Sequence, residues 1–146
     1  EGFVEVLREE GLGEDLVQRM GKPPVSFTQG GQAMGALLDR APDLHAVFAV
    51  SDLVGVGALM ECRRRGVRVP EDVSLMGFGG FEIGGAVVPA LTTVAVDYRA
   101  IGERTGTMVL DLLAGRHDVP RVVDLGVTLM QRETTAFRPA LVSVPA

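Results

Sequence analysis

Two apolar segments of this chain are each followed by small or polar residues that could contact a ligand. Ser51 and Asp52 follow the first segment, and the loop Phe78–Gly80 opens at the end of the second. A hydroxyl or carboxylate oxygen can accept hydrogen bonds from ligand hydroxyls, and glycine permits close approach to the backbone. Small-molecule sites in open α/β sheets lie at the carboxyl ends of strands. This pattern indicates binding of a small polar molecule.

Both Ser51 and Asp52 also have a purely structural interpretation. Serine and aspartate are favoured at helix N-caps, where either is worth about 1 kcal/mol. Since a helical pattern begins at Asp52, the residues alone leave the cap and the ligand contact open.

Groups that could do covalent chemistry are scattered. Cys62 is the single cysteine, and the two histidines, His45 and His117, belong to no shared motif. A thiol nucleophile needs a base nearby, so a buried structural thiol is expected. The adjacent carboxylates Glu71 and Asp72 follow a proline in a turn. This arrangement favours neither an enzyme nor a metal site, and no cofactor is expected.

The elements that must position these residues alternate between helix and strand. Helices are predicted at Gly2–Glu10, Gln32–Arg40, Asp52–Arg65 and Tyr98–Leu113, and strands at 22–28, Ala46–Val50, Val73–Gly77, Leu91–Val96 and Val122–Met130. Continuous apolar runs indicate strands that are covered on both faces. The fold class is therefore α/β, a parallel-sheet layered sandwich with helices on both faces.

Composition excludes several classes of function. The 146 residues carry a net charge of −5, and 5% are aromatic with no tryptophan, which argues against nucleic-acid contact by this segment. No apolar stretch is long enough for a transmembrane helix, so no membrane partner is expected. A single cysteine fits a reducing cytoplasm.

Three sequence motifs resemble motifs of one family of bacterial proteins. These are Val69-Pro-Glu-Asp-Val-Ser-Leu-Met-Gly-Phe78, Pro89-Ala-Leu-Thr-Thr93 and Gln131-Arg-Glu-Thr-Thr135. Together with Ser51-Asp52 they resemble the effector-binding core of LacI-type transcription regulators. The resemblance covers nearly the whole chain and is strongest from Asp43 to Thr135.

The resemblance implies a type I periplasmic-binding-protein-like fold, of which this chain supplies the C-terminal portion. Residues 1–91 would form the C-terminal lobe, truncated at its start. Residues 92–117 would be a crossover strand and a helix of the N-terminal lobe, and 118–146 the returning strands and tail. The first helix has no capping residue before it, and the chain is therefore expected to be a fragment.

The implied function is that of a sensor domain. A small effector, sugar-like or a related metabolite, would bind between the two lobes of the domain, and the protein would form a homodimer. Operator DNA would be bound through an upstream domain that this chain lacks. The alternative is a periplasmic solute-binding receptor with the same fold, which an upstream signal peptide would distinguish from an upstream helix-turn-helix.

The resemblance also implies site residues. Ser51 would face the effector, whereas Asp52 would be the helix cap or a contact in the cleft network. Phe78 and Gly79 would line the cleft, but the family usually has an aspartate where this chain has Gly79. That glycine either supplies a positive φ or indicates a less hydroxylated effector.

Phe27 would stack on the effector, with a buried core position as its alternative. Val56 and Val87 would contribute to the dimer interface, with simple core packing as the alternative for the helix that carries Val56. Arg132 would anchor the last strand through a salt bridge. The cations Arg63–Arg65 would point to solvent and complement the helix dipole.

The helix predicted at Tyr98–Leu113 carries an apolar stripe that the missing lobe would cover. Burial of apolar surface is worth about 25 cal/mol per Å², so in an isolated fragment this stripe is expected to pack on another molecule. Its members are Ile101, Thr105, Met108, Val109 and Leu112.

Overall fold

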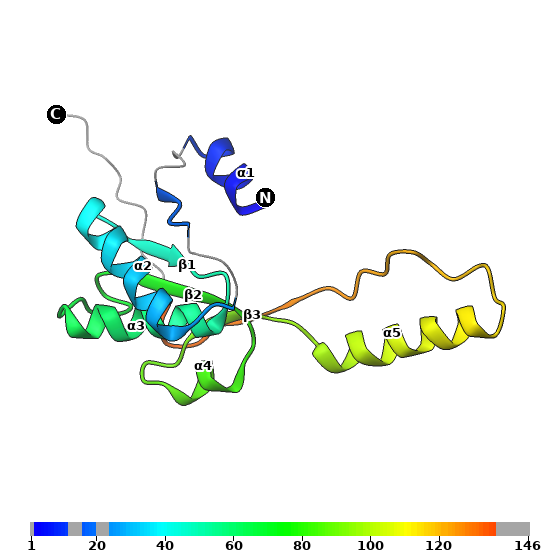
Figure 1. Cartoon of the computed structure of the whole chain (residues 1–146). Coiled ribbons are helices and arrows are strands. Elements are labelled where there is room, and N and C mark those ends of the chain that lie inside the picture. Colours follow the sequence, from blue (N-terminus) through cyan, green and yellow to red (C-terminus); the bar gives the residue numbers. More distant parts are fainter. Residues whose placement is uncertain (1, 12–15, 20–23, 137–146) are drawn as a thin grey trace.

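The computed structural model describes residues 2–11, 16–19 and 24–136, which form one small sheet with helices (Figure 1). In chain order the elements are α1 (Gly2–Glu9), α2 (Phe27–Arg40), β1 (Ala46–Phe48), α3 (Asp52–Arg64), β2 (Ser74–Gly79), α4 (Glu82–Ala86), β3 (Thr92–Ala95), α5 (Tyr98–Leu113) and β4 (Thr128–Met130). The alternation of strands and helices confirms the predicted α/β class.

The four strands lie side by side in the order of the sequence. The pairs β1–β2 and β2–β3 are parallel, because α3 and α4 carry the chain back between them. Val94 of β3 also pairs with Leu129 of β4, but this pair is antiparallel. The predicted parallel sheet is therefore a mostly parallel one, with a single antiparallel pair where β4 returns to the sheet after α5.

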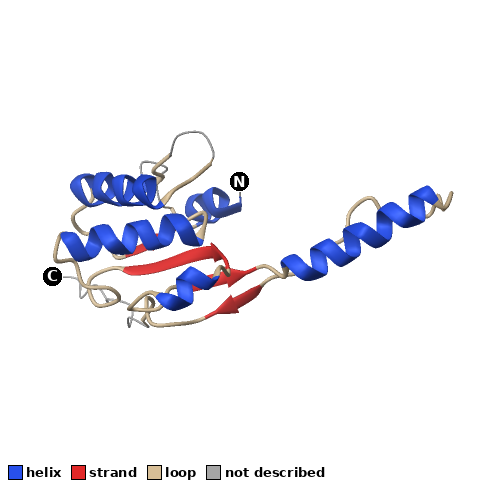
Figure 2. Cartoon of the chain, turned by 60° about the horizontal axis from the view of Figure 1, so that its bottom comes forward, coloured by secondary structure: helices blue, strands red, loops and turns tan. Residues whose placement is uncertain are grey.

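The hydrophobic core lies between the sheet and the helices α2 and α3 (Figure 2). Val47 packs against this core, so its neighbour Phe48 points to the opposite face of the sheet. There the Phe48 ring contacts Phe3 of α1, with 5.4 Å between the ring centroids. Helix α1 thus contacts the second face of the sheet through this ring pair. The buried core residues are Met34, Val56, Ala58, Leu59, Cys62, Val73, Leu75 and Leu91.

Helices α2 and α3 approach each other closely because glycines lie at their contact. A Cβ atom on Gly30 would lie 2.3 Å from the carbonyl oxygen of Val54, and one on Gly57 would lie 2.0 Å from that of Phe27. Neither position has room for a side chain. Glycines in this chain therefore serve helix packing and not only turns.

The start of α2 corrects one predicted strand. Strand 22–28 was expected, but the helix begins at Phe27 and residues 24–26 are not in a strand; Lys22 and Pro23 lie outside the described residues. Ser26 caps the helix, because its hydroxyl accepts from the Gln29 N–H while the Gln29 side chain accepts from the Ser26 N–H. This capping box stabilises a helix start inside the predicted strand.

Helix α5 extends away from the rest of the fold (Figures 1 and 2) and contains no buried residue. Its predicted stripe is bare in the single chain, with Ile101 40%, Val109 49% and Leu112 59% exposed. The strand predicted at Val122–Met130 is limited to β4, because residues 118–127 follow α5 without pairing. Within the described residues, no helix is long and apolar enough to cross a membrane.

Candidate functional site at the carboxyl ends of the strands

The candidate residues after β1 and β2 lie at one edge of the sheet. The two strands are parallel neighbours, so their carboxyl ends meet there. Ser51 follows β1 after a short loop, and Phe78 and Gly79 close β2. The Phe78 side chain is 36% exposed and points to the face opposite the core. The structure therefore brings these three predicted residues to a common edge.

Ser51 is the N-cap of α3. Its backbone is extended, with φ −157° and ψ 160°, and its hydroxyl oxygen accepts a hydrogen bond from the Val54 N–H at 3.4 Å. The residue is half-buried, and a hydroxyl has a second lone pair and a proton to offer. The structural interpretation of Ser51 is correct, and a ligand contact remains compatible with it.

Asp52 is not the cap and is fully buried. Its Oδ1 accepts from the Thr93 hydroxyl at 2.6 Å, and its Oδ2 accepts from the Phe81 N–H at 2.6 Å. The positive end of the α3 dipole also stabilises this carboxylate in the first helical turn. One side chain thus joins α3, the loop after β2 and strand β3. Because Asp52 has no exposed surface, a ligand cannot contact it in this arrangement.

The loop after β2 depends on two glycines with positive φ. Gly79 has φ +123° and Gly80 has φ +76°, conformations that side chains rarely adopt. The Gly80 N–H donates to the Thr93 hydroxyl at 3.4 Å. The predicted role of Gly79 in supplying a positive φ is confirmed.

Two aromatic residues that the sequence interpretation missed cover Gly79. The rings of Phe81 and Tyr98 stack with 5.9 Å between centroids and 29° between planes. A Cβ on Gly79 would lie 3.2 Å from the Phe81 ring and 3.2 Å from the Tyr98 hydroxyl. A signal was available, since Phe81 directly follows the glycine pair and Tyr98 is the first residue of α5, the helix that follows the neighbouring strand β3.

Phe27 lies elsewhere, at the start of α2. It lines a hollow between α2 and α3 together with Gly57 and Met60, and its side chain is 40% exposed. The core alternative for Phe27 is therefore wrong, and stacking on an effector remains a prediction.

Comparison with known proteins identifies the fold. Residues 1–135 match the family described as the periplasmic binding protein-like domain. A structure of a LacI family transcriptional regulator from Silicibacter pomeroyi superposes on 92% of this chain with a TM-score of 0.81 and 39% identity. The chain belongs to the family of periplasmic-binding-protein-like domains, and within it the chain is similar to the LacI type.

Other relatives of this LacI-type domain are also transcription regulators. The HTH-type transcriptional regulator GntR of Pseudomonas aeruginosa is 34% identical over 135 residues, which are 92% of this chain. A structure described as a complex of the transcriptional regulator CelR with cellobiose has a TM-score of 0.82 and 34% identity, and covers 91% of this chain. The LacI-type domain spans 39% of GntR, 48% of the Silicibacter chain and 40% of the CelR chain.

Arg132 holds the segment after β4 in place. Its guanidinium donates to the Leu91 carbonyl oxygen at 2.9 Å, so among the described residues a neutral acceptor takes the place of the expected salt-bridge partner. The buried Thr134 hydroxyl donates to the Leu75 carbonyl oxygen at 2.6 Å and accepts from the Thr92 N–H at 2.8 Å. These bonds hold the segment after β4 against β2 and β3.

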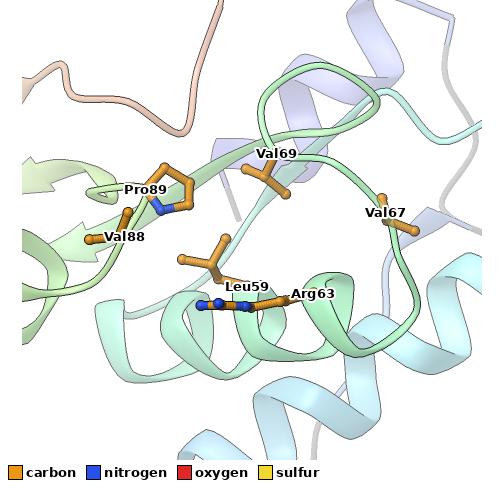
Figure 3. A pocket seen from close by; sticks show the side chains of 6 residues that line it. All are labelled: Leu59, Arg63, Val67, Val69, Val88 and Pro89. Carbon is orange, nitrogen blue, oxygen red and sulfur yellow. The ribbon is translucent and has the colours of Figure 1, made fainter.

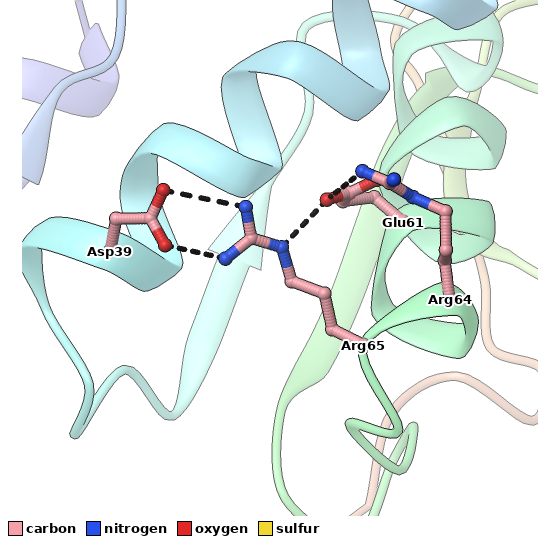
Figure 4. A network of polar contacts seen from close by, with 4 residues as sticks. All are labelled: Asp39, Glu61, Arg64 and Arg65. Carbon is pink, nitrogen blue, oxygen red and sulfur yellow. Dashed lines mark hydrogen bonds and ion pairs between the residues drawn. The ribbon is translucent and has the colours of Figure 1, made fainter.

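Two of the three arginines at the end of α3, Arg64 and Arg65, form ion pairs with carboxylates (Figure 4). Arg65 donates to Glu61 at 2.6 Å and to Asp39 of α2 at 2.5 Å, and Arg64 donates to Glu61 at 2.8 Å. The Arg65 guanidinium lowers the pKa of Asp39, and Arg65 followed by Arg64 lowers the pKa of Glu61. Arg65 links two helices, which corrects the expectation that all three cations only point to solvent.

The proposed dimer residues have different environments in the LacI-type domain. Val56 has no exposed surface and belongs to the core, so its assignment to the interface is corrected because no partner can touch it. Val87 is half-buried against the core, and the adjacent Val88 is 80% exposed. Val88 also borders a hollow of about 280 Å³ (Figure 3), whose lining residues are Leu59, Arg63, Val67, Val69, Val88 and Pro89.

The described residues offer little for covalent or metal chemistry. Burial raises the pKa of the Cys62 thiol to about 11, so the thiol stays protonated at neutral pH and is a poor nucleophile. Over residues 2–11, 16–19 and 24–136, no group of three histidine, cysteine or acidic side chains is arranged to hold a metal ion.

Proposed function

We propose that this chain is part of the sensor domain of a cytoplasmic transcription regulator. A sugar or related metabolite would bind at the edge formed by Ser51, Phe78 and Gly79. The observation that carries this proposal is the Asp52 carboxylate, which joins that edge to Thr93 of β3. Strand β3 leads directly into α5. A movement of this edge upon ligand binding would therefore be transmitted through β3 to α5.

Helix α5 would belong to the second lobe. It contains no buried residue, whereas α2 and α3 are integral to the core. Residues 92–117 would therefore cross into a lobe whose remaining sequence lies outside this chain. With only one side of the cleft present, the isolated chain should bind an effector weakly or not at all.

We also place a homodimer interface around Val87 and Val88. An isolated valine on a surface needs no explanation, but Val88 borders a largely apolar hollow next to Val87. A second copy of the chain, docked through the same face, would cover both. Operator DNA would be bound by a separate domain, because this chain is acidic.

Titration of the gene product that contains this chain tests the sensor function. Calorimetry with a panel of monosaccharides, disaccharides and sugar acids should find a ligand, and the same ligand should change the protein's affinity for its operator. Ser51→Ala should weaken ligand binding. Ser26→Ala is the matched control, because it removes an N-cap hydroxyl of the same kind from α2. A ligand that left operator affinity unchanged would instead favour a solute receptor.

A further inference from the structure

The hollow of Figure 3 lies at the opposite edge of the sheet from Ser51 and Gly79. Residues 67–73 lead into β2 and residues 87–91 lead into β3, and these two strands are parallel. The amino ends of both strands therefore meet at the hollow, whereas the candidate effector site lies at carboxyl ends. A molecule bound in this hollow would thus be separate from a ligand at the effector edge.

Hydrocarbon forms nearly all of the wall of this hollow. Leu59 is buried, and Val67 and Val69 pack against the core from partly buried positions. Val88 and Pro89 line the side that faces α3. None of these five side chains offers a hydrogen bond, so a ligand rich in hydroxyls would lose hydrogen bonds to water without replacement. The hollow of about 280 Å³ therefore suits a small ligand with an apolar body.

Arg63 is the polar side chain among those that line the hollow. It is the first of three consecutive arginines, and its neighbours Arg64 and Arg65 form ion pairs with carboxylates of α3 and α2. In the part of the chain that the structure describes, no ion pair or hydrogen bond engages the Arg63 guanidinium. Two carboxylates thus offset two of the three charges, and one positive charge remains beside the hydrocarbon wall.

The carboxyl end of α3 does not prevent an anion from binding beside Arg63. A helix carboxyl end carries partial negative charge through its free carbonyl groups, but here the carbonyl oxygens of Glu61, Cys62 and Arg63 accept from the N–H groups of residues 65–67 at 2.9–3.2 Å. The guanidinium is planar, and its parallel N–H groups match the two oxygens of a carboxylate. Arg63 can therefore hold the charged end of a ligand whose apolar end lies in the hollow.

We propose that this hollow is a second ligand site and that it takes a small carboxylic acid with an apolar body, such as a branched aliphatic or aromatic monocarboxylate. The apolar body would lie against Leu59, Val67 and Val69, and the carboxylate would pair with Arg63. Val88 also belongs to the proposed dimer face, so a second copy docked there would border the bound acid. The proposal goes beyond the sugar-like effector and does not depend on it.

The test uses the gene product that contains this chain, with leucine and valine methyl groups labelled for NMR. Benzoate and isovalerate are titrated beside their neutral amides, benzamide and isovaleramide. Each acid should shift the methyl signals of Leu59, Val67 and Val69 in a saturable manner and bind at least about fivefold more tightly than its amide. Arg63→Met should bind the acid as weakly as the amide. Arg64→Met is the matched control, because Arg64 precedes the same helix end without lining this hollow, and it should keep the preference.

The outcomes decide the proposal in either direction. If the amides bind as tightly as the acids, or if Arg63→Met keeps the preference for the acid, the proposal is overturned. It is also overturned if neither acid produces a saturable shift of these methyl signals. Sugar binding and the operator response are measured separately, so the sensor function can stand while this site falls, and the reverse. Melting temperatures establish that both variants are folded.

Discussion

The hydroxyl of Thr93 donates to the carboxylate of Asp52 at 2.6 Å, and both side chains are fully buried. This bond joins the first turn of α3 to the strand that leaves the sheet for α5. The second oxygen of Asp52 holds the Phe81 N–H. The candidate site is thus supported by a side chain that is itself hidden from any ligand.

Replacement of Asp52 by alanine should lower the free energy of unfolding by about 2–4 kcal/mol, because it leaves the Phe81 N–H and the Thr93 hydroxyl buried without this acceptor. Urea unfolding measures the loss. Asp43→Ala is the control, since Asp43 is exposed and its replacement should stay within about 0.5 kcal/mol of the wild type. Equal losses in the two variants would contradict the structural role of Asp52.

An alanine at Gly57 should be strongly unfavourable, because its Cβ would lie 2.0 Å from a backbone oxygen of α2. We expect Gly57→Ala to cost about 1–3 kcal/mol or more, since the two helices would have to separate. Gly102→Ala in α5 is the matched control, because no atom lies within 4 Å of its Cβ position. That variant should be stabilised by about 0.5–1 kcal/mol through higher helix propensity. Thermal unfolding should show a lower melting temperature for Gly57→Ala and a higher one for Gly102→Ala.

A comparison of alanine substitutions at Gly79 and Gly66 distinguishes the cost of backbone strain from the cost of crowding by neighbouring side chains. Both have positive φ, but a Cβ at Gly66 would meet nothing within 4 Å. Gly66→Ala should therefore cost about 1 kcal/mol, from backbone conformation alone. Gly79→Ala should cost more, since it also presses on Phe81 and Tyr98. If chemical denaturation gave Gly79→Ala the smaller loss, the packing of the aromatic pair over Gly79 would be wrong.

The ion pairs of Arg65 predict a loss of stability in acid. The pKa values of Asp39 and Glu61 are lowered from 3.8 and 4.5 in the folded state. Their stabilisation is fully present above these ordinary values and is lost as the pH falls through the lowered ones. Arg65→Met should therefore differ from the wild type in unfolding free energy at pH 7 and converge with it in acid. Arg63→Met removes the same charge from the same helix end and should show no such convergence.

The bare stripe on α5 predicts association of the isolated chain. Ile101, Val109 and Leu112 are between 40% and 59% exposed on a helix without buried residues. Sedimentation velocity should show a dimer or larger species, and Val109→Glu should shift the chain toward the monomer. A wild-type chain that stayed monomeric at high concentration would contradict this.

The general architecture could be predicted from the sequence because its signals are local. The buried runs before Ser51 and Gly79, and the glycine that ends α3, identify a strand or a helix within a few residues. The start of α2 was missed because two local signals compete there. Pro23 and Pro24 in the sequence suggested the entry of a strand, but the Ser26–Gln29 capping box favours a helix and prevails.

The candidate site was predicted less completely because its contacts are not local. Phe81 and Tyr98 stack across two elements, and no periodicity marks such a pair. Serine and aspartate are both good caps, and the sequence could not show that Ser51 takes this role while Asp52 turns inward toward Thr93. Val56 could not be assigned to the core or to a surface, since α3 is apolar on nearly all sides.

The antiparallel pairing of β3 with β4 also bears on how the chain could move. The segment that runs out to α5 and the segment that comes back are joined by the pairing of Val94 with Leu129. They therefore cannot slide past each other without breaking backbone hydrogen bonds. Since the same β3 residues also pair with β2, this part of the chain is held on both sides within the sheet, and any swing of α5 must be taken up at residues 96–97 and 116–127, which lie outside the strands.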